Sequence, residues 1–109
     1  LLVLANYIKK YDNVVLACSL LKESYRNILI RENNKKHISL IYLRGNIDQI
    51  KERIRKRDHS FFPQTLLESQ FNILEEPDEY ECIIVDILFS VDYILKYIIQ
   101  NLKKNNKLK

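Results

Sequence analysis

Hydroxyl and basic side chains follow an apolar run near the N-terminus. Val14–Cys18 is short and continuously apolar, which is typical of a strand buried on both faces of a parallel sheet. Ser19 comes next and can cap the following helix with its hydroxyl. Lys22 and Arg26 lie one turn apart on that helix, and a carboxylate or phosphate would suit such a pair. The residues leave open a solvated face on which Glu23 partly neutralises Arg26.

Two further apolar runs carry charged residues at their ends. Ile38–Leu43 predicts a buried strand followed by Arg44, and Cys82–Ile87 predicts another that contains Asp86. Helical periodicity covers residues 1–11, 20–31, 47–57, 65–74 and 90–102. Strands alternating with helices predict an α/β fold with a parallel sheet, whose ligands lie beyond the carboxyl ends of the strands. The segment from Ser19 to Arg26 should therefore meet Arg44 and Asp86 at one edge.

A basic run ends the helix predicted over residues 47–57. Its apolar stripe is Ile47, Ile50 and Ile54, and Arg57 continues the stripe by three residues. This spacing predicts an arginine near the core side of the helix end that needs an anionic partner. The next segment, Asp58–Pro63, is irregular and aromatic. It could form a mobile cover over a phosphate site or an ordinary loop that plugs the core.

Composition limits the classes of function. The 109 residues suffice for one domain, and a chain without Met is expected to be a piece of a longer protein. The net charge of +4 matches the four lysines of residues 103–109, expected to be a disordered basic tail. Lys51–Arg57 lacks the interleaved aromatic residues of a nucleic-acid groove. Cys18 and Cys82 sit in apolar runs, which predicts buried, reduced thiols in a cytoplasmic protein and no metal site.

Four motifs in order carry a family resemblance. ACSLLKESYRNILIR, IYLRGNIDQIKERIRKR, HSFFPQTLLESQFNILEEP and IIVDI resemble the C-terminal part of gluconokinases of the P-loop kinase type. The resemblance runs from about residue 1 to residue 87. It implies a nucleoside-monophosphate-kinase-like fold, with a parallel sheet sandwiched by helices and incomplete at its N-terminus. Residues 1–102 would form a single partial kinase domain with a lid at about residues 55–64.

The resemblance also implies an activity, ATP-dependent phosphorylation of D-gluconate to 6-phosphogluconate with Mg²⁺. The residues that would face gluconate are Ser19, Lys22, Arg26 and Arg31. Those assigned to ATP and the lid are Arg53, Arg57 and Gln70, with Arg57 catalytic. The implied partners are gluconate, ATP and a second copy in a homodimer, without nucleic acid or membrane.

Two departures from the family pattern bear on activity. The phosphate-binding motif GxxxxGK[ST] is absent, so the amides and lysine that cradle the triphosphate are missing. We therefore predict that these residues alone cannot catalyse the reaction. In the lid, Ser60 stands where the family usually has His, and His59 comes one place early. The alternatives are a non-catalytic remnant or binding module, and a related kinase acting on shikimate or a nucleotide.

Overall fold

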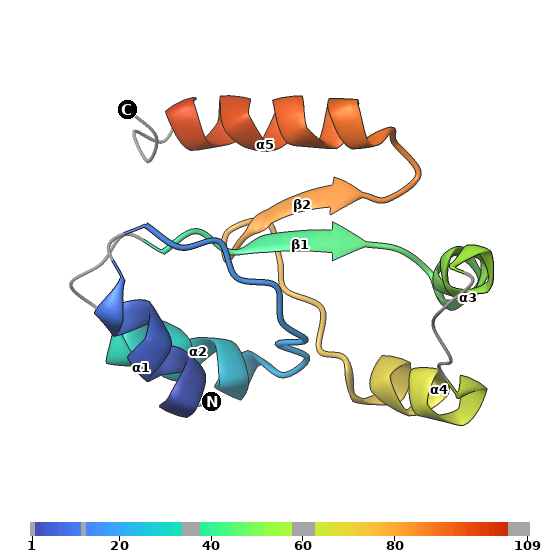
Figure 1. Cartoon of the computed structure of the whole chain (residues 1–109), viewed down its shortest axis with the longest axis horizontal. Coiled ribbons are helices and arrows are strands. Elements are labelled where there is room, and N and C mark those ends of the chain that lie inside the picture. The colour runs from blue at the N-terminus through green and yellow to red at the C-terminus, as the bar shows by residue number, and fades with distance from the viewer. Residues whose placement is uncertain (1, 12, 34–37, 58–62, 105–109) are drawn as a thin grey trace. The chain divides into compact units, whose positions relative to one another are not determined.

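The computed structural model describes residues 2–11, 13–33, 38–57 and 63–104, which fall into two compact units. The first unit consists of Leu1–Ile38 and Leu74–Glu76, and the second of Ser39–Ile73 and Pro77–Lys109. The elements are, in order, α1 (Leu2–Lys10), α2 (Glu23–Glu32), β1 (Ile41–Arg44), α3 (Ile47–Lys56), α4 (Gln64–Ile73), β2 (Ile83–Asp86) and α5 (Val91–Lys104), as labelled in Figure 1.

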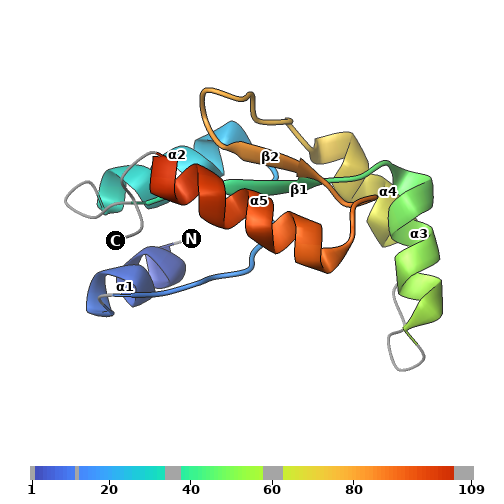
Figure 2. The ribbon, with the colours of Figure 1, turned by 90° about the horizontal axis from the view of Figure 1, so that it is seen from above.

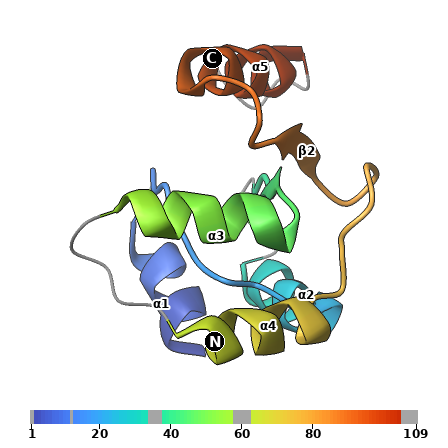
Figure 3. The same cartoon turned by 90° about the vertical axis from the view of Figure 1, so that its right-hand side faces the viewer.

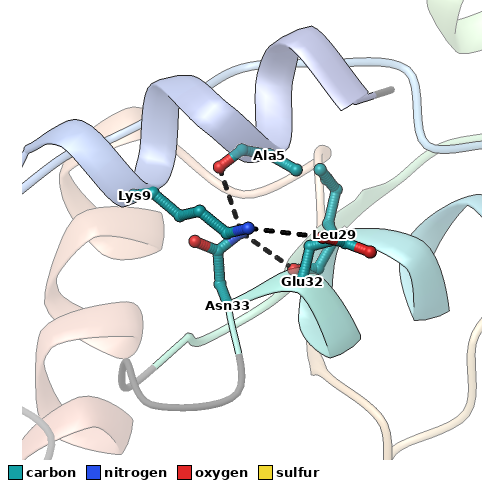
Figure 4. Close-up of polar contacts among 5 residues, drawn as sticks. All are labelled: Ala5, Lys9, Leu29, Glu32 and Asn33. Carbon is teal, nitrogen blue, oxygen red and sulfur yellow. Dashed lines mark hydrogen bonds and ion pairs between the residues drawn. The ribbon is translucent and has the colours of Figure 1, made fainter.

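The first unit is a pair of helices, α1 packed against α2. Ala5 on α1 and Leu29 on α2 are both buried. Asn33 ends α2, and its side-chain amide donates to the carbonyl oxygens of Ala5 at 3.3 Å and Leu29 at 3.1 Å (Figure 4). An exposed ion pair between Lys9 and Glu32, at 3.3 Å, links the same two helices. One buried amide thus ties both helix backbones together.

The strand predicted over Val14–Cys18 is wrong. Residues 14–21 carry no strand or helix, and Val15 and Cys18 are exposed. An apolar run becomes a strand only when a neighbouring strand pairs with its backbone, and the described residues form one sheet with β1 and β2 as its strands. The prediction of a buried thiol at Cys18 is wrong for the same reason, while Cys82 is partly buried.

The second unit contains a parallel pair of strands. β1 pairs with β2 in the register Ile41 to Ile83 through Arg44 to Asp86. Figures 1 and 2 show α5 running alongside β2, against which it packs. Val85 in β2 is buried. Both strands were expected, and each is shorter than its apolar run because pairing covers only four residues of it.

Helices α3 and α4 pack against each other in the same unit, as Figures 1 and 3 show. Helix α3 begins with a capping box, in which Asn46 Oδ1 accepts from Gln49 N and Gln49 Oε1 accepts from Asn46 N, both at 2.8 Å. Such a cap stabilises a helix by about 1 kcal/mol. All five predicted helices are present, with ends moved by at most three residues. In the described residues, no helix is both long and apolar enough to cross a membrane.

Candidate active site

The carboxyl ends of β1 and β2 lie side by side. Arg44 and Asp86 are register partners at these ends, as the alternation of strands and helices predicted. Asp86 Oδ1 accepts a hydrogen bond from the amide of Leu88 at 2.8 Å, which fixes the turn that leaves β2. Arg44 is exposed beside it. This edge therefore presents one guanidinium and one oriented carboxylate to a ligand.

Gly45 follows β1 at the same edge and lies against Ile87. A β-carbon at position 45 would stand 2.8 Å from Ile87 Cγ1 and closer still to its Cδ1. The Ile87 side chain is buried, so it has little space into which to move. The glycine is therefore required for close packing of the two strand ends.

Substituting Gly45→Ala is expected to lower the free energy of unfolding by about 1–2 kcal/mol, because overpacking forces neighbouring side chains off their rotamers. Urea unfolding measures the loss. In an Ile87→Ala background the loss should be much smaller, since both Ile87 atoms are gone and the contact that remains is Gln49 Oε1 at 3.3 Å. An equal loss in the two backgrounds would contradict the steric explanation.

Arg53 is the first of the residues predicted to face ATP. It lies on α3, and its guanidinium donates to the carbonyl oxygen of Ile87, just beyond β2. This contact joins α3 to the strand ends. Gln70, also predicted to face ATP, is half-buried on α4.

Most other charges of the basic run are paired along the helices. Arg55 donates to both carboxylate oxygens of Glu52, at 3.2 and 2.7 Å, and Lys56 lies 3.9 Å from the same carboxylate. These contacts lower the pKa of Glu52, chiefly through the hydrogen bond from Arg55. Lys51 lies 3.9 Å from Glu68 on α4. Two carboxylates therefore pair with three of the five cations of the run.

Arg57 stands apart from this pairing. Within the described part of the chain, no carboxylate lies within ion-pairing distance of its guanidinium. The prediction that it emerges near the core side is wrong, because Arg57 is exposed. The helix ends at Lys56, and Arg57 has the non-helical angles φ −90° and ψ 99°, so the helical stripe does not extend to it. The exposed cation is available to an anionic ligand.

The other predicted site residues belong to the first unit. Ser19 is exposed, and the prediction that it caps the helix is wrong, because α2 begins four residues later with Lys22 at the N-cap. Lys22 makes no side-chain cap; its carbonyl accepts from the amides of Tyr25 and Arg26, at 3.0 and 3.2 Å. Its ammonium lies 5.8 Å from the centre of the Tyr25 ring.

Arg26 is 4% exposed and donates from Nη1 to the carbonyl oxygen of Leu20 at 2.9 Å. The adjacent Leu21 carbonyl accepts from the amide of Glu75 at 2.8 Å. These two contacts hold the segment that enters α2. Arg31, in the last turn of α2, is exposed.

The predicted site residues therefore divide between the two units. Ser19, Lys22, Arg26 and Arg31 belong to the first, and Arg53, Arg57 and Gln70 belong to the second. Residues 58–62 of the predicted lid, including Ser60 and His59, lie outside the described residues.

Two features of this edge are missing from the predictions made from the sequence. One is the packing of Gly45 on Ile87, and the other is the Asn46–Gln49 capping box. Both had a signal: Gly45 is the single glycine of the chain and follows a strand, and Asn46 precedes a glutamine at the spacing of a capping box.

The described residues contain no group of three or more His, Cys, Asp or Glu side chains placed to hold a metal ion. The phosphate-binding motif, with the hydroxyl that would contact Mg²⁺, is also not in the sequence. The described residues therefore do not fit a resident Mg²⁺ site. The exposed cations Arg44 and Arg57 are present in this part of the chain.

Known proteins resemble this chain in sequence and in structure. No family model matches the chain. It is 38% identical to the thermoresistant gluconokinase of Escherichia coli K12, over 83% of this chain and 51% of that protein. It is 37% identical to a probable gluconokinase of Dictyostelium discoideum, over 82% of this chain and 47% of that one. The crystal structure of a gluconokinase from Sinorhizobium meliloti 1021 matches with a TM-score of 0.82 and 27% identity, over 94% of this chain and 59% of that one.

The fold is therefore that of the P-loop kinases, represented here by part of its parallel sheet and the helices around it. Within that class, the chain is gluconokinase-like over most of its length, which confirms the resemblance seen in the motifs. The chain spans about half the length of the curated relatives it matches.

Proposed function

We propose that this chain supplies the sugar-acid and lid residues of a gluconokinase, which transfers phosphate from ATP to D-gluconate and forms 6-phosphogluconate. The observation that carries the proposal is the 38% identity to a gluconokinase over 83% of the chain. The GxxxxGK[ST] motif must come from elsewhere, because it is not in this sequence. The chain is thus not competent alone, and its two free thiols fit the reducing conditions of the cytoplasm.

In this proposal, the exposed cations act by positioning and charge stabilisation. Arg57 lacks an ion-pair partner in the described residues and would contact the transferring phosphoryl group, where negative charge is redistributed. Lys22 and Arg31 would bind the gluconate carboxylate. Arg26 would act indirectly, by holding the Leu20 carbonyl oxygen and the segment that leads into α2. ATP with Mg²⁺ supplies the phosphoryl group and its countercharge.

The test is a chimera. The part of this chain that matches the Escherichia coli thermoresistant gluconokinase replaces the matched 92-residue region of that protein. The formation of 6-phosphogluconate from gluconate and ATP is then measured. We expect turnover by the chimera and none by the isolated chain. Arg57→Ala in the chimera should lower kcat/KM by about 10²-fold, while Lys56→Ala, which removes a neighbouring paired cation, should change it little. Shikimate and a nucleoside monophosphate serve as competing substrates.

A non-catalytic binding module is the second candidate, favoured by the missing phosphate-binding motif. A folded chimera that binds gluconate but forms no product would support the module and refute the kinase proposal. Robust ATP-dependent turnover by the isolated chain would show instead that the motif is dispensable.

A further inference from the structure

A short stretch of chain after α4 belongs to the first unit. Leu74–Glu76 groups with residues 1–38, although the residues before it and after it belong to the second unit. The backbone amide of Glu75 donates to the Leu21 carbonyl oxygen at 2.8 Å, and the Glu75 side chain is exposed. The stretch therefore joins the first unit through its backbone, at the segment that leads into α2.

The local sequence explains why the Glu75 amide is available for this contact. Helix α4 ends at Ile73, and residues 74–78 carry no helix or strand. Pro77 disfavours a helical backbone at the residue before it, so the chain leaves the helix and does not re-enter one. Pro77 is also buried, which fixes the end of the stretch. An amide in such a stretch needs an acceptor elsewhere in the chain, and the Leu21 carbonyl provides it.

Three successive carbonyl oxygens hold the segment that leads into α2. The Leu20 carbonyl accepts from Nη1 of Arg26 at 2.9 Å, and the Lys22 carbonyl accepts from the amide of Arg26 at 3.2 Å. The Leu21 carbonyl lies between them in the chain and accepts from Glu75. Lys22 is the N-cap of α2 and makes no side-chain cap, so it does not fix the start of the helix in that way. Of these two donor residues, Glu75 is the one outside α2.

The contact at Leu21 acts directly on Lys22. The Leu21 carbonyl and the Lys22 amide belong to one planar peptide group, so a donor that fixes the carbonyl also fixes where the Lys22 residue begins. Lys22 has an extended backbone, with φ −105° and ψ 145°, and its side chain is half-buried. Its ammonium lies 5.8 Å from the centre of the Tyr25 ring. Loss of the Glu75 donor would therefore free the residue that carries this ammonium.

We propose that Glu75 is a positioning residue for the binding of the sugar acid. Its backbone amide, and not its carboxylate, holds the peptide between Leu21 and Lys22 and so places the Lys22 ammonium for the carboxylate of gluconate. The inference rests on the proposed function, in which Lys22 binds that carboxylate. A displacement of about 1 Å in a binding group can cost on the order of 10²-fold in rate. The flexible stem of lysine absorbs part of such a shift, so the expected loss is smaller.

The experiment compares two substitutions at one position. Glu75→Pro removes the amide hydrogen together with the side chain, whereas Glu75→Ala removes the carboxylate and keeps the amide. Proline is common this close to the end of a helix. In the full 109-residue chain without ligand, the Arg26 amide should exchange roughly five times faster in Glu75→Pro than in Glu75→Ala, because the start of α2 is loosened.

The functional readout is the KM for gluconate in the chimera described above. Glu75→Pro should raise this KM about tenfold, and Glu75→Ala should leave it within about twofold of the wild-type value. KM does not depend on how many molecules are folded, so a merely structural role would lower the apparent kcat and leave KM unchanged. An ester in place of the Glu75 amide keeps the side chain and removes only the donor. It provides the same test should the proline variant not fold.

Two outcomes in an active chimera would overturn the proposal. One is an unchanged KM for gluconate when the amide donor is removed. The other is an equal rise in KM with Glu75→Ala, which would mean that the carboxylate itself contacts the ligand. If the chimera forms no 6-phosphogluconate, the kinase proposal fails, and the dissociation constant of gluconate from calorimetry then replaces KM in the same comparison. A folded chimera that binds no gluconate would refute both proposals.

Discussion

Substituting Asn33→Asp is expected to lower the free energy of unfolding by about 3 kcal/mol at neutral pH. The wild-type amide donates to the Ala5 and Leu29 carbonyl oxygens, and Asn33 is 4% exposed. The substitution keeps the shape and replaces the donor with an oxygen. It removes two hydrogen bonds of about 1 kcal/mol each and buries a charge against two carbonyl oxygens. A negative charge at the end of α2 is also unfavourable to the helix dipole.

The loss should depend on pH in a definite direction. Burial and the two carbonyl oxygens raise the folded-state pKa of the introduced carboxyl above its unfolded value of about 3.9. A group with a raised folded pKa contributes stability below its unfolded pKa and loses it as pH rises through the folded pKa. The protonated carboxyl can still donate one hydrogen bond. The difference from wild type should therefore be smallest below about pH 4 and largest near pH 7.

Urea unfolding of both proteins across this pH range measures the effect. Asn27→Asp is the matched control, because Asn27 is exposed on the same helix and the substitution makes the same change in charge. It should alter stability by less than about 0.5 kcal/mol. A pH-independent loss for Asn33→Asp would mean that packing, and not the direction of the hydrogen bonds, holds α1 to α2.

The burial of the Asn33 side chain between α1 and α2 could not be predicted from the sequence. Asn33 Oδ1 is buried and accepts no hydrogen bond from the described residues. A polar residue after a helix indicates an exposed connection, and Asn33 follows the helix predicted over residues 20–31. The residue is instead buried because Ala5 lets the two helices approach closely. That approach depends on residues 28 positions apart, which no local pattern contains.

The helices were predictable because their signals are local. The stripe of Ile47, Ile50 and Ile54 gave α3 almost to the residue, and its capping box fixes where it begins. The run from Val14 to Cys18 failed because strand formation depends on a partner strand elsewhere in the chain or beyond it. Apolar runs of similar composition do form strands in β1 and β2, because each of these strands supplies hydrogen-bond partners for the other.

The predictions for the candidate site were likewise correct in part and wrong in part. The convergence of Arg44 and Asp86 followed from the topology of parallel strands and is present. The position of Arg57 was wrong because it was extrapolated from α3 beyond the helix end. A helical stripe indicates burial only while the backbone stays helical, so residues that cap a helix need a separate argument from turn geometry.

For Arg26, a role in folding and a role in ligand binding lead to different expected results of substitution. Its guanidinium was predicted to face gluconate, and the structure buries the side chain with Nη1 on the Leu20 carbonyl oxygen. A hydrogen bond made by a charged group contributes about 1.5–3 kcal/mol to stability. Removing the Arg26 guanidinium leaves the Leu20 carbonyl oxygen without this donor. Arg26→Met keeps the length of the side chain and should lower the free energy of unfolding by about 2–3 kcal/mol.

Thermal and urea unfolding of the isolated chain test this without substrate. Arg31→Met is the matched control, since Arg31 lies on the same helix and is exposed, and it should change stability by less than about 0.5 kcal/mol. In the chimera, Arg31→Met should raise the KM for gluconate, whereas Arg26→Met should act mainly through the folded fraction. If Arg26→Met unfolds like wild type and raises only KM, the buried contact contributes nothing to folding and Arg26 binds gluconate directly.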